Sequence, residues 1–266
     1  MSFCKILNFN KTESIKTYIY LILFLLLILF LANCASPQKS SSKELAQVHL
    51  RLGTNHLENG LYPEALKDLL TAESYDSTDP LIQNNLGLAY FMRDKYDLAE
   101  IHLKNAVKLE SSFTDAKNNL SRVLIEKNNL SEAKSYIKDV LNDLTYSYAW
   151  KAYINLGLAQ FKESNFKEAK ESFLTALNSE RENCLAANYY ARSLLELKNY
   201  KPAVVAFEKA EAYCLKSKFD EPSYFSALNF YRMGDAYKAK LKFESLIERG
   251  SSFKEKSEQM LELLKK

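Results

Sequence analysis

The sequence predicts an all-α chain built from about six helix-turn-helix repeats, and two observations carry this prediction. From Leu45 onwards apolar residues recur with the 3.6-residue period of an amphipathic helix, and no segment alternates as a strand does. One alanine also recurs in every predicted second helix, at spacings of 34, 34, 36, 34 and 36 residues: Ala65, Ala99, Ala133, Ala169, Ala203 and Ala239. A period of this length indicates repeated pairs of helices.

The clearest repeat covers residues 80–113 and carries Leu86, Gly87, Tyr90, Ala99, Leu103 and Ala106. This spacing resembles the tetratricopeptide repeat, and the resemblance implies a right-handed α-solenoid. Repeats of the same pattern extend over residues 45–249, and the final helix at residues 251–266 is expected to cover the open end. The expected repeat boundaries are 46–79, 80–113, 114–149, 150–183, 184–219 and 220–250. The two 36-residue steps place extra residues near 145–149 and 216–219.

Glycine and proline fit this pattern. Gly53, Gly87 and Gly157 fall where the two helices of a repeat cross, a place that requires a small side chain. The turn between the helices carries Gly60 and Gly234, and a positive φ is expected there. In the other repeats we assign this turn position to Asp94, Asn128, Asn165 and Asn199. Pro63, Pro80, Pro202 and Pro222 fall in first turns of helices, where proline is tolerated.

The first 33 residues are predicted to be a lipoprotein signal peptide. A basic segment precedes fifteen apolar residues at 18–32, and fifteen helical residues are too short to span the ~30 Å hydrocarbon core of a bilayer. The following Leu31-Ala32-Asn33-Cys34 resembles a bacterial lipobox, although Asn33 replaces the usual Gly, Ala or Ser, and this resemblance implies lipidation of Cys34. An uncleaved signal anchor and a chance apolar run remain the alternatives.

Residues 34–44 are expected to form the lipidated terminus and a flexible tether, because residues 37–43 are rich in Ser, Lys and Gln and lack periodicity. The lipobox resemblance implies a place on the periplasmic side of a bacterial envelope. Ala35 and Ser36 after the cysteine, with no Asp there, resemble the signal for the outer membrane.

Cys184 and Cys214 are the two thiols left in the repeats once Cys4 and Cys34 are assigned to the leader and the lipid. In the predicted register Cys184 opens the first helix of the fifth repeat and Cys214 lies in the last turn of the second. Antiparallel helices bring these two ends together, so we predict a disulfide, which an oxidising compartment would favour. Two buried free thiols are the alternative.

Composition argues against several functional classes. The formal charge of +3 includes Lys5, Lys11 and Lys16 against Glu13, so the chain without its leader carries +1, and no basic stripe indicates a nucleic-acid partner. His49, His56 and His102 fall at repeat positions without a metal-binding motif, and no phosphate-binding loop occurs. We therefore expect no enzyme activity, cofactor, metal or small-molecule substrate.

The resemblance to tetratricopeptide proteins implies a peptide-binding groove on the first helices of the repeats. Asn amides can pair with the backbone of an extended peptide, and Arg can hold a carboxylate in bidentate fashion. The alternative is that the apolar members are partly buried and that the Asn side chains are structural. The candidate groove residues are Asn84, Leu88, Phe91, Asn118, Arg122, Ile125, Ile154, Leu158, Phe161, Asn188, Arg192, Leu195, Tyr224 and Tyr231.

A second resemblance concerns the combination of lipobox, six repeats and cap, which looks like the type IV pilus pilotin lipoproteins. The segment at residues 146–159, with Ala152, Asn155, Leu156 and Gly157, is similar to the central repeat of that family. The resemblance implies a scaffold that helps a secretin ring to assemble. A structural subunit of another outer-membrane assembly or export machine is the alternative, and an enzyme-associated subunit ranks last because no site is visible.

Overall fold

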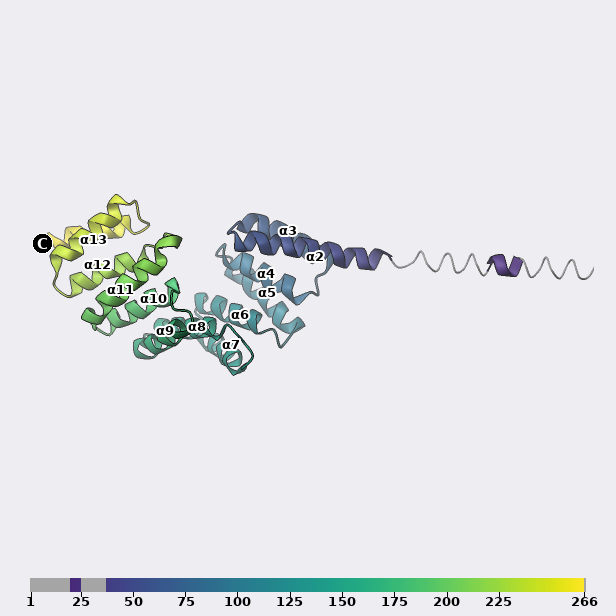
Figure 1. The fold of residues 1–266 in the computed structure, drawn as a ribbon, viewed down its shortest axis with the longest axis horizontal. Helices are drawn as coiled ribbons and strands as arrows, with labels where there is room; N and C mark the ends of the chain where they lie inside the picture. Colours follow the sequence, from purple (N-terminus) through teal and green to yellow (C-terminus); the bar gives the residue numbers. More distant parts are fainter. Residues whose placement is uncertain (1–19, 25–36, 266) are drawn as a thin grey trace, which may run out of the picture. The chain divides into compact units, whose positions relative to one another are not determined.

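The computed structural model describes residues 20–24 and 37–265, and these residues are helical or in turns, with no strand among them. They fall into two compact units that divide after Ile82, and each unit is described by itself. The first unit consists of α2 (Pro37–Glu58), α3 (Tyr62–Tyr75) and the start of α4 (Pro80–Phe91). The remainder of α4 and all later helices form the second unit (Figure 1).

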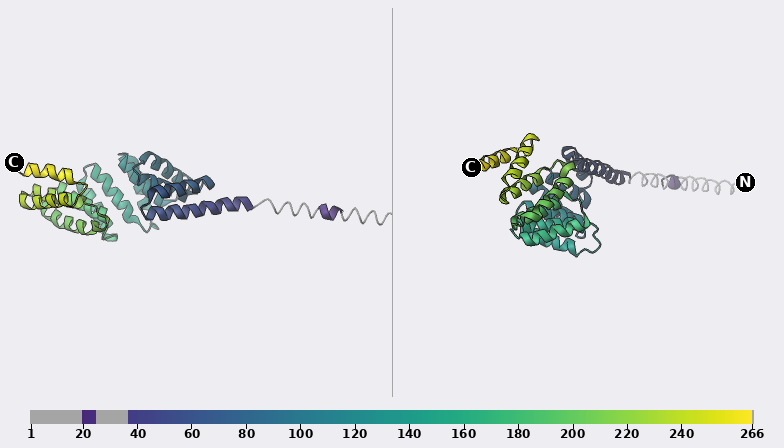
Figure 2. Two further views of the ribbon diagram at one scale, coloured as in Figure 1. Left: turned by 90° about the horizontal axis from the view of Figure 1, so that it is seen from above. Right: turned by 60° about the vertical axis from the view of Figure 1, so that its left-hand side comes forward.

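Helices of the second unit follow one another as pairs, each joined by a short turn (Figures 1 and 2). The last pair is followed by α14 (Lys254–Leu264). The bounds of the paired helices are α5 (Tyr96–Leu109), α6 (Thr114–Glu126), α7 (Leu130–Asn142), α8 (Ala149–Lys162), α9 (Phe166–Ser179), α10 (Cys184–Glu196), α11 (Tyr200–Cys214), α12 (Glu221–Arg232) and α13 (Ala236–Glu248). With α2 and α3 these helices make six pairs within the described residues, so the predicted all-α repeat fold with a capping helix is confirmed.

Close crossing of the two helices in a pair depends on small residues. A Cβ added at Gly87 would lie 2.5 Å from Leu103 Cγ, and one added at Gly157 would lie 2.7 Å from Phe173 Cε1. Both distances are far below van der Waals contact, so a larger side chain would force the helices apart. The six recurring alanines of the second helices all have 0% exposure: Ala65, Ala99, Ala133, Ala169, Ala203 and Ala239.

The turn between paired helices contains one residue with positive φ, and its position corrects part of the prediction. Gly60 and Gly234 adopt φ of 72° and 82°, and Asp94 and Asn128 adopt 57° and 61°, as expected. In the fourth and fifth repeats the positive φ belongs to Ser164 (62°) and Lys198 (60°) and not to Asn165 and Asn199, which cap the next helix. The backbone hydrogen bonds Lys198 N–Leu195 O and Asn199 N–Leu194 O set this turn, whatever residue occupies it.

The N-terminal boundary of α2 corrects a second expectation. α2 begins at Pro37, so residues 37–44, predicted to be a flexible tether, belong to a helix. Proline is suited to a first helical turn, and Ser, Lys and Gln do not interrupt a helix that later residues have nucleated by packing. The signal peptide, apart from the helical residues 20–24, and Cys34 lie outside the described residues. Within the described part of the chain, no helix is long and apolar enough to cross a membrane.

Extra residues of the third repeat form an ordered loop between α7 and α8. Thr114 donates to Asp143 (2.6 Å), and the Tyr146 hydroxyl donates to Asp115 (2.7 Å), so the loop is held against the start of α6. Burial and the bond to Asp115 raise the pKa of Tyr146. The extra residues of the fifth repeat form a short 3₁₀ turn, Leu215–Ser217.

The C-terminal helix covers the last repeat as predicted. Met260, Leu261 and Leu264 of α14 pack against the core formed by α12 and α13. Phe253, which precedes α14, stacks on Tyr224 with ring centroids 4.8 Å apart. The apolar face of the last helix pair is therefore partly removed from water.

Candidate functional site

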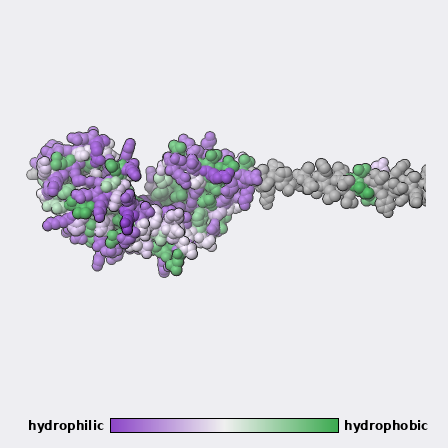
Figure 3. Space-filling view, viewed as in Figure 1, coloured by the Kyte–Doolittle hydropathy of each residue, from purple (hydrophilic) through white to green (hydrophobic). Residues whose placement is uncertain are grey.

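On the face shown in Figure 3, the distribution of hydrophobic residues does not by itself identify a binding site. Figure 3 shows small apolar areas scattered among hydrophilic side chains on the described helices. Two pockets formed by the first helices of the repeats are more informative, because they gather residues from several repeats.

One pocket, here called the A-helix pocket, has a volume of about 260 Å³ and is lined from α4, α5, α6, α8 and the start of α10. It contains the predicted groove residues Leu88, Phe91, Asn118, Arg122 and Ile154. Met92, Trp150 and Leu185 complete much of its apolar wall, and Met92 is 46% exposed. The structure therefore brings together part of the predicted groove from the second, third and fourth repeats.

Two cations lie in the wall of the A-helix pocket, and the lining contains no carboxylate. Arg122 pairs with Glu126 one turn further along its own helix, with Nη2 and Oε1 3.1 Å apart, and its guanidinium lies 5.8 Å from the centre of the Phe91 ring. Lys151 lies 3.7 Å from Asp115 and 4.5 Å from the centre of the Tyr148 ring. The pocket thus combines apolar walls with two cations whose carboxylate partners, Glu126 and Asp115, lie outside the lining.

A second pocket of about 400 Å³, here called the Arg192 pocket, lies between the C-terminal parts of α6, α8 and α10. Leu158, Phe161 and Arg192 of the predicted groove line it, and Ile125 forms part of its base with 0% exposure. Charges of both signs occur in this lining, so it offers no preference for one sign of partner.

Asparagines form a network between repeats, in agreement with the alternative that the Asn side chains are structural. Asn119 Nδ2 donates to Asn84 Oδ1 (2.9 Å), and Asn84 Nδ2 donates to Asn85 Oδ1 (3.0 Å). Asn155 Nδ2 lies 3.0 Å from Asn118 Oδ1. Since the Asn84 amide is 4% exposed and engaged at both ends, it does not present itself to a peptide.

The Asn188 and Arg192 pair is occupied by the chain itself. Arg192 Nη1 donates to Glu221 Oε1 (3.0 Å), and Asn188 Nδ2 donates to Glu221 Oε2 (2.7 Å). The guanidinium lies 4.0 Å from the centre of the Phe225 ring and 4.5 Å from that of Tyr189. Burial raises the pKa of Tyr189, and the smaller effect of the Arg192 charge opposes this shift. The carboxylate expected from a partner is thus supplied by α12, and the pair joins two repeats.

The remaining groove candidates are placed differently from the prediction. Leu195, like Ile125, is fully buried in the core, which excludes it from an exposed groove. Tyr224 stacks on Phe253 beside the cap, and Tyr231 is 41% exposed but lines neither pocket. Leu195, Tyr224 and Tyr231 occupy the same repeat positions as residues that line the pockets. Their exposure to solvent differs because the neighbouring helices cover each repeat to a different extent.

Cys184 and Cys214 are joined in a disulfide in the structure, with Cα atoms 4.8 Å apart. The start of α10 meets the end of α11, which is the juxtaposition that the predicted register requires. The bridge closes a loop of sequence separation 30 around the fifth repeat.

The histidines take part in packing. His49 Nδ1 and His56 Nδ1 lie 3.2 and 3.1 Å from the two carboxylate oxygens of Asp68, and His102 stacks on Tyr90. Among the residues described, no group of three or more His, Cys, Asp or Glu side chains is arranged to hold a metal ion.

Trp150 and Leu185 are pocket residues that the prediction omitted. Both lie in the first turn of the first helix, Trp150 at the first and Leu185 at the second position of its repeat. Repeat position could have indicated Leu185, whereas Trp150 stands one position earlier in its repeat.

Comparison with known proteins agrees with this geometry. Residues 50–109 and 154–214 match the family model described as tetratricopeptide repeat. These two segments are tetratricopeptide repeats. It is also 27% identical over 121 residues to the protein STIP1 homolog of Dictyostelium discoideum, and this match covers 44% of the repeat protein. The chain spans about a fifth (22%) of the length of that curated relative.

Solved structures share the fold at low sequence identity. The pilF protein of Pseudomonas aeruginosa aligns with a TM-score of 0.65 and 20% identity, over 78% of this chain and 93% of pilF. PilW, titled a widely conserved type IV pilus biogenesis factor, aligns with a TM-score of 0.69 and 18% identity, over 76% and 92% of the two chains. A tetratricopeptide repeat protein from Parabacteroides merdae gives 0.64 and 15%, over 83% and 84%. The repeat protein therefore has pilus-related relatives in fold.

Proposed function

We propose that the repeat protein is a non-catalytic scaffold that binds a segment of a partner protein in the A-helix pocket. The observation that carries this proposal is the composition of the pocket wall: apolar side chains from several repeats surround two cations, with no carboxylate in the lining. An apolar side chain of the partner would enter between Phe91, Trp150 and Ile154, and an adjacent carboxylate would meet Arg122 or Lys151. Tetratricopeptide-repeat proteins are in general scaffolds of this kind, which supports the absence of catalysis.

The proposed location is the periplasmic side of the bacterial envelope, with the chain anchored by a lipid on Cys34 and directed to the outer membrane. The lipobox-like Leu31-Ala32-Asn33-Cys34 supports this location, because it ends a basic and apolar leader in the order expected of a lipoprotein signal peptide. The Cys184–Cys214 disulfide is compatible with it, because disulfides persist in oxidising compartments.

The proposed process is assembly of a type IV pilus secretin. The fold shared with pilF and PilW over most of both chains supports this choice over other envelope machines. A structural subunit of another outer-membrane assembly or export machine is the second candidate. The identity of the protein that binds the A-helix pocket distinguishes the pilus proposal from this second candidate.

A photo-crosslinker at Met92 should capture an envelope protein in living cells. Met92 lies in the wall of the A-helix pocket, whereas Met233, an exposed methionine after α12, is outside it and provides the matched control. Replacing Arg122 with Glu should weaken capture by about tenfold or more, because like charges then face each other. The captured protein is identified by mass spectrometry.

A secretin in the crosslinked product supports the pilus proposal, and a subunit of another outer-membrane machine supports the second candidate. Equal capture from Met92 and Met233, or capture that Arg122→Glu leaves unchanged, contradicts the A-helix pocket as the binding site.

The lipid anchor gives a separate expectation. Cys34→Ser should abolish incorporation of labelled fatty acid and move the protein from the membrane fraction to the soluble fraction, because a lipid chain supplies the membrane affinity. Cys4→Ser, which changes the other N-terminal cysteine, is the matched control and should leave labelling intact. Labelling that persists in Cys34→Ser would contradict lipidation at this residue.

A further inference from the structure

A third concave surface, here called the α9–α11 groove, lies between α9 and α11 and over α10. It has a volume of about 450 Å³. Ala187, Tyr190 and Leu194 of α10 form its floor. At 100° per residue these side chains project from nearly the opposite side of α10 to Asn188 and Arg192. The groove is therefore separate from both pockets described above.

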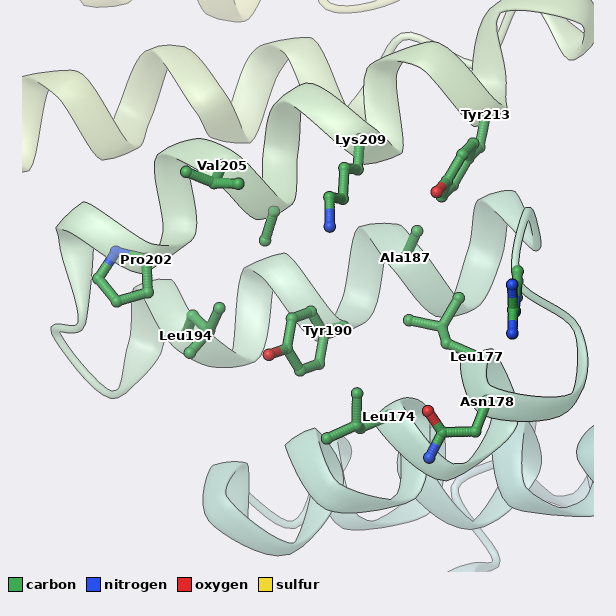
Figure 4. Close-up of a pocket in the computed structure, with 12 residues that line it drawn as sticks. Leu174, Leu177, Asn178, Ala187, Tyr190, Leu194, Pro202, Val205, Lys209 and Tyr213 are labelled. Carbon is green, nitrogen blue, oxygen red and sulfur yellow. The ribbon is translucent and has the colours of Figure 1, made fainter.

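Stripes of residues with helical spacing form the walls of this groove. Leu174 and Leu177 come from α9, and Val205, Lys209 and Tyr213 come from α11. Figure 4 shows these side chains on either side of α10, with Lys209 and Tyr213 extending from α11 over the floor. Leu174 is 38% exposed and Val205 is 54% exposed, so apolar surface here faces water.

Positive charge accompanies this apolar surface. Arg181 and Lys209 belong to the lining, and no Asp or Glu does. Both are exposed, and within the described residues neither lies within ion-pair distance of a carboxylate. Two free cations at the edge of an apolar groove favour an occupant that carries carboxylates.

Elsewhere in the second unit, ion pairs join the second helices of two pairs of successive repeats, α5 with α7 and α11 with α13. Lys104 of α5 meets Glu132 of α7 at 3.1 Å, and Lys242 of α13 meets Glu211 of α11 at 2.7 Å. Between α9 and α11, as between α7 and α9, no such pair occurs among the described residues, and Arg181 and Lys209 in the groove lining remain available. The missing carboxylate partner is what an external ligand would supply.

We propose that the α9–α11 groove binds an acidic amphipathic helix of a partner protein. Leu- or Ile-type side chains of that helix would lie between Leu174 and Val205, and its Glu or Asp side chains would meet Arg181 and Lys209. A helix suits the groove because its ridges have the same three- and four-residue spacing as the stripes on α9 and α11. This surface is independent of the A-helix pocket and makes the repeat protein a scaffold with two binding faces.

The test uses a fluorescent 18-residue peptide with Leu at helical i, i+3, i+4 and i+7 positions and Glu at the others. The control peptide carries Lys in place of every Glu. Fluorescence anisotropy with the full-length folded protein should show binding of the acidic peptide and at least about tenfold weaker binding of the basic one. Added salt should weaken the acidic complex, because it screens exposed charges.

The double variant Arg181→Glu/Lys209→Glu should weaken binding of the acidic peptide by about tenfold or more and strengthen binding of the basic peptide. Lys201→Glu changes the charge of an exposed residue of α11 outside the groove and should leave both affinities unchanged. Val205→Glu provides a second variant at an exposed site, and circular dichroism verifies that each variant is folded.

Equal binding of the two peptides, no detectable binding of the acidic peptide, or an effect of Lys201→Glu as large as that of the groove variant would overturn the proposal. Arg122→Glu in the A-helix pocket should leave the acidic peptide unaffected in this assay. A loss there would instead place the peptide in the A-helix pocket, so failure of one proposal is distinguishable from failure of the other.

Discussion

Replacing both Cys184 and Cys214 with alanine should lower the free energy of unfolding by about 3–4 kcal/mol. The disulfide closes a loop of sequence separation 30, and its removal gives the unfolded chain the conformational freedom of that loop. Alanine is the appropriate replacement at Cys214, because that side chain is 1% exposed and a serine hydroxyl there would be buried. Denaturant titration of both proteins measures the difference.

Reduction of the unchanged protein is the matched control for this substitution. Dithiothreitol should shift its unfolding midpoint toward that of the double variant and leave the variant itself unaffected. Local opening can be followed by hydrogen exchange of α10 and α11, where protection should fall most. If non-reducing peptide mapping of the protein from its native source finds both thiols free, the disulfide and the proposed oxidising compartment are both contradicted.

Replacing Arg192 with alanine should lower the free energy of unfolding by about 2–3 kcal/mol, the second largest effect we expect. Arg192 and Glu221 are only 16% and 19% exposed, so loss of the guanidinium leaves a largely buried carboxylate with Asn188 as its remaining partner. The contacts with the Phe225 and Tyr189 rings are lost as well. Partial exposure keeps the value below that of a fully buried pair.

Arg122 provides a matched control, because it occupies the same repeat position two units earlier. Its partner Glu126 lies on the same helix, and both side chains are 26% exposed, so Arg122→Ala should cost less than about 1 kcal/mol. A double-mutant cycle with Arg192→Ala and Glu221→Ala measures the coupling between the two side chains. Equal losses for Arg122→Ala and Arg192→Ala would contradict the role assigned to the contact between α10 and α12.

The A-helix pocket could be predicted from the sequence only in part. Repeat position identifies Phe91, Arg122 and Ile154, since each stands at a groove position on the first helix of its repeat. The same rule also selected Ile125 and Leu195, which the structure buries completely. A repeat position determines the direction in which a side chain projects from its own helix. Whether that side chain is exposed to solvent depends on how closely the next helix packs, and this packing differs between repeats.

What the sequence by itself determined is the arrangement along the chain: the helix pairs, the small residues at the crossings and the juxtaposition of Cys184 with Cys214. These follow from local periodicity and from steric limits at Gly87 and Gly157, which act within one repeat. Tertiary structure alone decided that Glu221 engages Arg192 and that the α9–α11 groove remains open. Both depend on packing and charge partners between different repeats, and a repeat pattern does not specify which long side chain reaches across that boundary.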